Sequence, residues 1–155
     1  MAAIKLIVYP TDFSDLSRHA LDHAILLAER FDAALHCVHV LDDSYQYWMT
    51  LSAEAIPVAP PIEELAAAAE KELEQFVAEH VPAGLHAERT VLRGRPFIEI
   101  IRYAREVGAD MIVMGTHGRS AIKQVLLGSV AEKVVRKAPC PVLTVRHPEH
   151  NFEMP

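Results

Sequence analysis

The sequence has little of what marks a secreted or membrane protein. It holds only two cysteines, Cys37 and Cys140, which lie in separate apolar runs without a C-x-x-C pair. We therefore expect buried free thiols in a reducing compartment rather than a disulfide. The first apolar run ends at Pro10 and Asp12, too early for a secretion signal, and no later run reaches the roughly 18 apolar residues of a membrane span. These absences predict a soluble, cytoplasmic protein without membrane contact.

Positive charge is scarce as well. Fifteen Lys and Arg stand against 21 Asp and Glu, for a formal net charge of −6, and no Lys/Arg run is longer than a pair. Binding to a nucleic acid backbone needs a basic surface, so we expect no DNA or RNA partner. The motifs G-x4-G-K-[ST], G-x-G-x-x-G and G-x-S-x-G are also absent, which excludes the commonest NTPase, dinucleotide and hydrolase interpretations.

What the sequence does contain is an alternation of strand and helix patterns. Its 155 residues, 51% of them hydrophobic, fit one domain, predicted over 1–147, with a frayed tail at 148–155. Short β-branched runs predict five strands, at 4–9, 34–40, 86–92, 110–115 and 141–146. Apolar residues at helical spacing lie between them. This order predicts an α/β fold: an open, doubly wound parallel sheet with helices on both faces.

In such sheets, ligands bind at the carboxyl ends of the strands where the strand order reverses. The loops after the first and fourth strands are "PTDFSD" and "GTHGRS". The second loop contains Gly115 and Gly118, and Gly128 with Ser129 follows. Glycine suits positions that need a positive φ or a close approach of backbone to a ligand. The capping-box spacing of "SVAE" predicts a helix that begins at Ser129, with this serine as its cap. The N-terminus of such a helix can bind an anion.

Each loop has two interpretations that the residues leave open. Gly115 and Gly118 form either a tight turn or a phosphate-binding loop, to which Arg119 adds charge. After the first strand, Asp12 and Ser14 either cap the next helix or contact a ligand. In the second case Asp12 binds a base, a ribose or a metal on the phosphates, and Val40 at the end of the second strand offers backbone groups to a purine.

Together these residues resemble the universal stress protein family. The resemblance covers residues 4–146 and rests on "PTDFS", on G-x2-G-x9-G-S from Gly115 to Ser129, and on the closing "APCPVLTVR". It implies a Rossmann-like sheet with strand order 3-2-1-4-5, a homodimer through strand 141–146, and ATP binding with Mg²⁺. The nucleotide-binding residues expected from it and from the loops are Pro10, Thr11, Asp12, Val40, Met114, Gly115, Thr116, His117, Gly118, Arg119, Gly128, Ser129 and Val130.

Three functions remain open at this point. The leading hypothesis is an ATP-binding stress-response or signalling module with slow or no hydrolysis. The second is a slow ATPase or self-phosphorylating enzyme that uses Asp12, His117 or Ser129. The third is an interaction scaffold that recruits a partner through the aromatic, proline-rich segment 42–62. No residue is assigned as catalytic, and no protein metal ligand is expected beyond Asp12 acting through Mg-ATP.

Overall fold

The computed structural model describes residues 3–44, 60–118 and 127–148. Its strands are β1 (Leu6–Pro10), β2 (Ala34–Leu41), β3 (Ala87–Arg93), β4 (Met111–Gly115) and β5 (Val142–Val145). Its helices are α1 (Asp15–Phe31), α3 (Ile62–His80), α4 (Pro96–Glu106) and α5 (Ser129–Lys137). Every predicted strand is found, with ends within two residues of the predicted ones. The β-branched runs therefore located the strands correctly.

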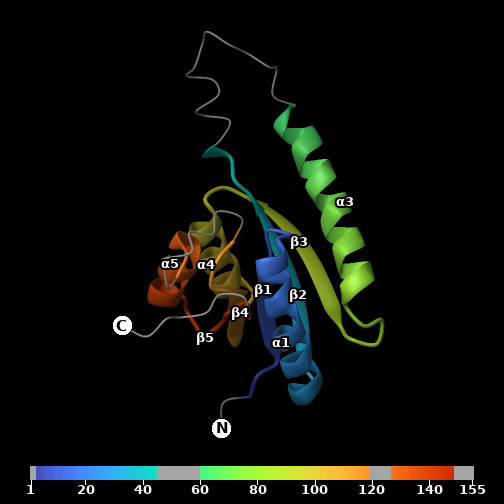
Figure 1. The fold of residues 1–155 in the computed structure, drawn as a ribbon, viewed down its shortest axis with the longest axis vertical. Helices are drawn as coiled ribbons and strands as arrows, with labels where there is room; N and C mark the ends of the chain where they lie inside the picture. The colour runs from blue at the N-terminus through green and yellow to red at the C-terminus, as the bar shows by residue number, and fades with distance from the viewer. Residues whose placement is uncertain (1–2, 45–59, 119–126, 149–155) are drawn as a thin grey trace.

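The strands form one parallel sheet in the order β3-β2-β1-β4-β5, which confirms the predicted α/β fold (Figure 1). β1 pairs with β2 from Leu6 opposite Ala34 to Pro10 opposite Val38. On its other side β1 pairs with β4, with Ile7 opposite Met111. The strand order therefore reverses between β1 and β4, which is where the predicted ligand loops leave the sheet.

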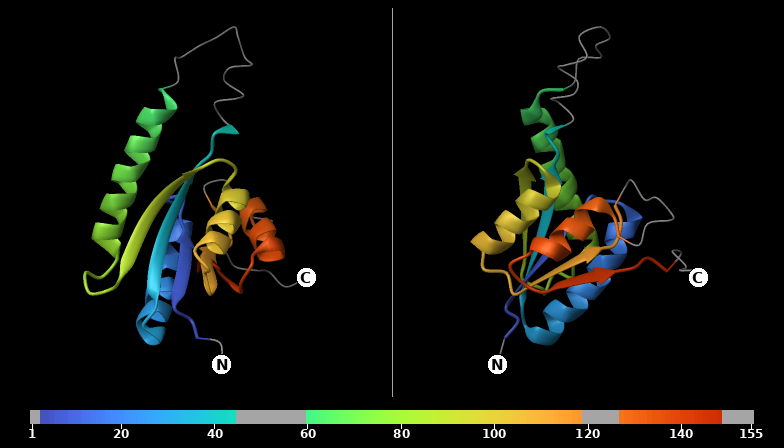
Figure 2. Two further views of the ribbon diagram at one scale, coloured as in Figure 1. Left: turned by 180° about the vertical axis from the view of Figure 1, so that it is seen from behind. Right: turned by 90° about the vertical axis from the view of Figure 1, so that its left-hand side faces the viewer.

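Helices cover both faces of the sheet, α1 and α3 on one and α4 and α5 on the other (Figure 2). On one face, α1 and α3 bury Leu21 and Phe76 against Tyr9 and other sheet residues. On the other face, α4 and α5 bury Ile100 and Val134 in the cluster that contains Val8 and Val38. Successive residues of a strand point to opposite faces, so each strand supplies both cores and reads as a nearly continuous apolar run.

The starts of the helices follow local sequence signals, with one correction. Ser14 is the N-cap of α1, and its hydroxyl accepts a hydrogen bond from the Ser17 N–H, as expected for a capping serine. α4 begins with Pro96, whose fixed φ suits the first helical position. α5 begins at Ser129 as predicted, but the N-cap is Gly128 and no side chain caps the helix. The predicted capping role of Ser129 is therefore wrong.

Several sequence-based expectations concern residues outside the described part of the chain. Most of segment 42–62, most of the tail 148–155, and Arg119 lie there. Within the described residues, no helix is long and apolar enough to cross a membrane. Both cysteines are free thiols: Cys37 is buried as expected, whereas Cys140 is only partly buried. Burial raises the pKa of Cys37 to about 12, so this thiol stays protonated and behaves as a core residue.

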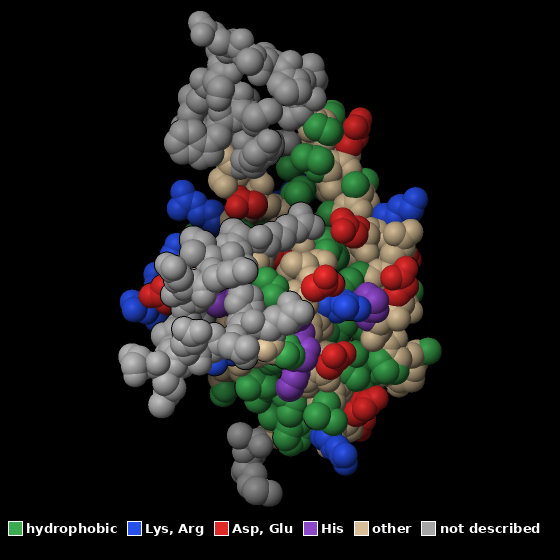
Figure 3. All heavy atoms as spheres, in the orientation of Figure 1, with side chains coloured by type: hydrophobic (Ala, Val, Ile, Leu, Met, Phe, Trp, Pro, Cys, Tyr) green, Lys and Arg blue, Asp and Glu red, His purple; other side chains and the backbone are tan. Residues whose placement is uncertain are grey.

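The molecular face in Figure 3 shows how the charged side chains are distributed. Asp and Glu are scattered over the part that holds α1 and α3, with single Lys or Arg side chains among them, and further Lys and Arg side chains lie along the left-hand edge. Over the α1 and α3 part, the described side chains form no continuous basic surface.

A histidine is buried between the sheet and α4. His36 is 8% exposed; its Nδ1 lies 3.0 Å from the Tyr103 hydroxyl and its Nε2 3.5 Å from the Glu88 carboxylate. Burial lowers the pKa of His36, against the opposing effect of Glu88. The fold therefore favours the neutral imidazole.

This histidine predicts a pH-dependent stability. The folded protein binds a proton on His36 more weakly than the unfolded chain does. The contribution of His36 to folding stability is therefore complete above the ordinary histidine pKa of 6.5. The contribution is lost as the pH falls through 6.5 toward the lower folded-state pKa. Urea unfolding at pH 8 and pH 5.5 should show a larger loss of stability for the wild type than for His36→Asn. The exposed His23→Asn is the control and should follow the wild type; equal losses for His36→Asn and the wild type would contradict the prediction.

Candidate functional site

A pocket of about 490 Å³ opens where the loops after β1 and β4 separate, on the side of the sheet covered by α4 and α5. Twelve of the thirteen predicted site residues line it, and the thirteenth, Arg119, lies outside the described residues. The twelve are Pro10, Thr11, Asp12, Val40, Met114, Gly115, Thr116, His117, Gly118, Gly128, Ser129 and Val130. Segments more than 100 residues apart in the sequence therefore meet in one cavity.

The loop after β1 is held by a network of hydrogen bonds. The Thr11 N–H donates to the Val38 carbonyl at 2.8 Å, which continues the pairing of β1 with β2. The Thr11 hydroxyl accepts from the Phe13 N–H and lies 3.0 Å from the Ser17 hydroxyl. The Tyr9 hydroxyl donates to the Ser17 carbonyl at 2.8 Å. Burial raises the pKa of Tyr9, which keeps this phenol a protonated donor.

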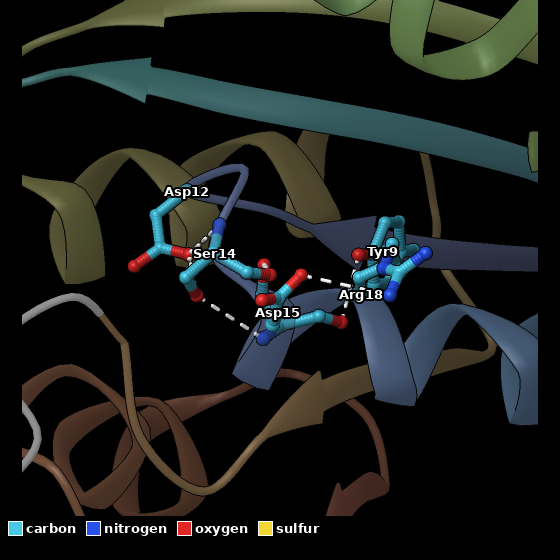
Figure 4. A network of polar contacts seen from close by, with 6 residues as sticks. Tyr9, Asp12, Ser14, Asp15 and Arg18 are labelled. Atoms are coloured by element: carbon cyan, nitrogen blue, oxygen red, sulfur yellow. Dashed lines mark hydrogen bonds and ion pairs between the residues drawn. The ribbon is translucent and has the colours of Figure 1, made fainter. Parts of the chain in front are cut away.

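Asp12 lies at the turn of this loop with one carboxylate oxygen engaged (Figure 4). Its Oδ1 accepts hydrogen bonds from both the N–H and the hydroxyl of Ser14, the residue that also caps α1. Its Oδ2 lies close to Gly118 of the loop after β4. The sequence left open whether this loop caps a helix or lines a site. In the structure the loop does both, because Ser14 caps α1 and Asp12 lines the pocket.

Phe13 has a strained backbone within the same loop. Its φ of 63° is left-handed, which costs a residue with a Cβ about 1–2 kcal/mol. The ring is held on the far side of the loop from the pocket: it stacks on His39 at 4.4 Å between centroids and meets Phe76 edge-on at 5.7 Å. Strain of this kind persists only where the surrounding contacts hold it.

The three motif glycines allow neighbouring segments to approach closely, and they do not adopt a left-handed backbone. Among the described glycines, positive φ is found at Gly94 and Gly108 and at none of the motif positions. A Cβ on Gly118 would lie 2.5 Å from the Asp12 Oδ2, and one on Gly128 would lie 3.2 Å from the Thr116 carbonyl. A Cβ on Gly115 would lie 3.1 Å from the Leu16 carbonyl. Each glycine thus lets two segments around the pocket come together.

The N-terminus of α5 faces this pocket. The Gly128 N–H donates to the Thr116 carbonyl at 2.7 Å, and the first bond along the helix runs from the Glu132 N–H to the Gly128 carbonyl at 2.9 Å. The intervening N–H groups precede that bond and have no intrahelical partner by geometry. With a glycine N-cap and no side-chain cap, this end of the pocket offers backbone donors and the positive end of the helix dipole.

The wall formed by β2 and α4 is apolar, and sequence reasoning missed its residues Val38, Pro96 and Ile100. Elsewhere in the lining, the prediction lacks Ser17, Leu127, Ala131 and Glu132. Val38 could have been found, because it precedes Val40 by two residues and so shares its face of β2. Pro96 and Ile100 share a face of α4 by their spacing of four, but nothing in the sequence indicated that this face reaches the pocket.

The polar residues of the pocket limit which ions the protein could hold by itself. His117 is 9% exposed, and its Nδ1 lies 3.1 Å from the Thr116 hydroxyl. Asp12 and Glu132 are the carboxylates of the lining. Within the described residues, no three His, Cys, Asp or Glu side chains are arranged to bind a metal ion. A cation here would therefore take part of its coordination from a ligand.

A profile described as the Universal stress protein family matches residues 3–146. The chain is 39% identical over 145 residues to the universal stress protein MJ0531 of Methanocaldococcus jannaschii, covering 94% of this chain and 84% of that protein.

Solved structures agree with the sequence relatives. The structure of MJ0577, another universal stress protein of M. jannaschii, superposes with a TM-score of 0.78 at 31% identity and covers 94% of this chain and 97% of its own. A universal stress protein solved in complex with cAMP superposes with a TM-score of 0.68 at 28% identity, over 93% of this chain and 98% of its own. This chain belongs to the universal stress protein family.

Proposed function

We propose that this protein binds ATP with Mg²⁺ and acts as a nucleotide-dependent stress-response or signalling module, with slow or no hydrolysis. The observation that carries the proposal is the pocket itself, in which an apolar wall from β2 and α4 is joined to a helix N-terminus with no side-chain cap. An adenine nucleotide has the same two-part chemistry, with a flat base at one end and phosphates at the other. A family member solved in complex with cAMP supports the choice of an adenine ring.

The residues present fit each part of the nucleotide. Val38, Val40 and Ile100 give the base an apolar slot, and the end of β2 supplies backbone groups for its polar edge. In this binding mode the Asp12 carboxylate and the Thr11 backbone, at the end of β1, would meet the ribose. The first turn of α5 and the Gly118 backbone provide N–H groups for the phosphates. We infer that the Mg²⁺ arrives with the phosphates, because Asp12 and Glu132 would otherwise repel them.

An enzyme is the second candidate, and the buried position of His117 in the pocket lining is the observation that favours it. In that case His117, Asp12 or Ser129 would act on the terminal phosphate. Release of phosphate that His117→Asn abolishes while ATP binding persists would establish this function in place of the first.

Nucleotide binding is tested by calorimetric titration with ATP, AMP and cAMP. The wild type should bind ATP, and Gly118→Ala should weaken the affinity about tenfold, equal to about 1.4 kcal/mol. The reason is steric, since the new Cβ would lie 2.5 Å from the Asp12 Oδ2 and would displace a carboxylate of the proposed site. Gly84→Ala is the matched control, because a Cβ there meets nothing within 4 Å. Absence of binding by the wild type to all three nucleotides at high micromolar concentration would refute the function.

We also propose a homodimer through β5, the predicted strand 141–146. β5 is an edge strand of the sheet, and its Leu143 is 38% exposed. Such an edge is protected when it pairs with a second chain.

The dimer is tested by light scattering after gel filtration at micromolar concentration. The wild type should have twice the mass of the chain, and Leu143→Glu should be monomeric because it places a charge in the interface. Val135→Glu, which changes a somewhat more exposed apolar residue of α5 (45%), is the control and should remain a dimer. A monomeric wild type would contradict the proposal.

A further inference from the structure

His39 lies behind the pocket rather than in it. On β2 it follows Val38 and precedes Val40, both of which line the pocket. Because strand side chains alternate, His39 points to the opposite face, toward α1 and α3. Its recorded contacts include two parts of the loop after β1: the Thr11 carbonyl and the Phe13 ring.

The contact with Thr11 fixes a proton on His39. The Nδ1 lies 2.9 Å from the Thr11 carbonyl oxygen, and a carbonyl oxygen only accepts. The Nδ1 must therefore carry a hydrogen and donate it. This bond joins β2 to the first residue after β1, next to the backbone bond from Thr11 to Val38.

The contact with Phe13 acts on the strained position of the loop. The stack on His39 and the edge contact with Phe76 hold the Phe13 ring on the α1 and α3 face while its backbone is left-handed. That backbone turn brings the Ser14 N–H and hydroxyl back to the Asp12 Oδ1. The Asp12 Oδ2 is then directed toward Gly118.

We propose that His39 is a positioning residue for the nucleotide pocket: it donates Nδ1–H to the Thr11 carbonyl, holds Phe13 left-handed by stacking, and so aims Thr11 and Asp12 at the ligand. This inference rests on the proposed nucleotide function. It assigns a role in binding to a residue that does not contact the ligand, and it connects the pocket to Phe76 of α3 on the other face of the sheet.

Two variants separate the donor from the stack. His39→Phe keeps an aromatic ring against Phe13 and removes the donor, whereas His39→Asn keeps an amide N–H near the Nδ1 position and removes the ring. ATP affinity measured by calorimetry should fall about tenfold in His39→Phe, the scale of one lost buried hydrogen bond with its unpaired partner. It should fall less, by about threefold, in His39→Asn, which keeps the donor and loses only the stack on Phe13. The exposed His86→Phe is the control and should bind as the wild type does.

Two outcomes would overturn the proposal: His39→Phe binding ATP as the wild type does, or His39→Asn binding as weakly as His39→Phe. Circular dichroism checks that each variant is folded.

A second measurement uses the wild type alone. Nitrogen-proton correlation spectra at pH 8 should show a protonated Nδ1 on His39. An unprotonated Nδ1 would remove the basis of the inference.

Separate results test the nucleotide function and the positioning role of His39. If the wild type binds no nucleotide, the function is refuted, and the inference is then judged without ligand. A strong contact between the amide and Hα protons of Phe13 reports a left-handed residue. That contact should be present in the wild type and in His39→Phe, which keeps a ring against Phe13, and it should weaken in His39→Asn, which removes the stack. Its persistence at full strength in His39→Asn would refute the role of the stack in holding Phe13.

Discussion

The pairing of β1 with β4 is the contact on which the rest of the structure depends. After β1 the chain moves outward through β2 and β3 with α1 and α3 on one face. It then returns to β4 on the other side of β1, and α4 and α5 cover the second face. Because right-handed crossovers place these two sets of helices on opposite faces, the loops after β1 and β4 separate. That separation creates the pocket between neighbouring strands.

Tight packing, rather than special glycine backbone angles, closes the pocket around its polar end. The glycines let the loop after β4 approach the Asp12 carboxylate, the Leu16 carbonyl and the start of α5. The strained backbone is at Phe13 instead. The loop after β4 is thus shaped by glycines, which have no side chain to keep the segments apart. The loop after β1 is shaped by Phe13, whose ring is held on the opposite face of the sheet.

The electrostatics of the pocket follow from the same arrangement. Two carboxylates, Asp12 and Glu132, line it together with the positive end of the α5 dipole. The Asp12 Oδ1 is bound by Ser14, and Glu132 pairs with Arg136 at 3.1 Å. Both acids therefore have partners within the protein, and the first-turn N–H groups of α5 are left for an anion. A nucleotide with its own cation complements this distribution of charge.

The sequence by itself determined the order of elements and the parallel sheet, because β-branched runs and helical stripes record which face each element buries. For most of the pocket residues, local patterns left a turn and a binding loop both open, and the resemblance to the universal stress protein family supplied the prediction. Only the tertiary structure decided that Gly128 rather than Ser129 caps α5, that α4 supplies an apolar wall, and that His39 supports the loop from the opposite face. These three features depend on distances between segments far apart in the chain. Tertiary packing sets those distances, so the local spacing of residues in the sequence does not indicate them.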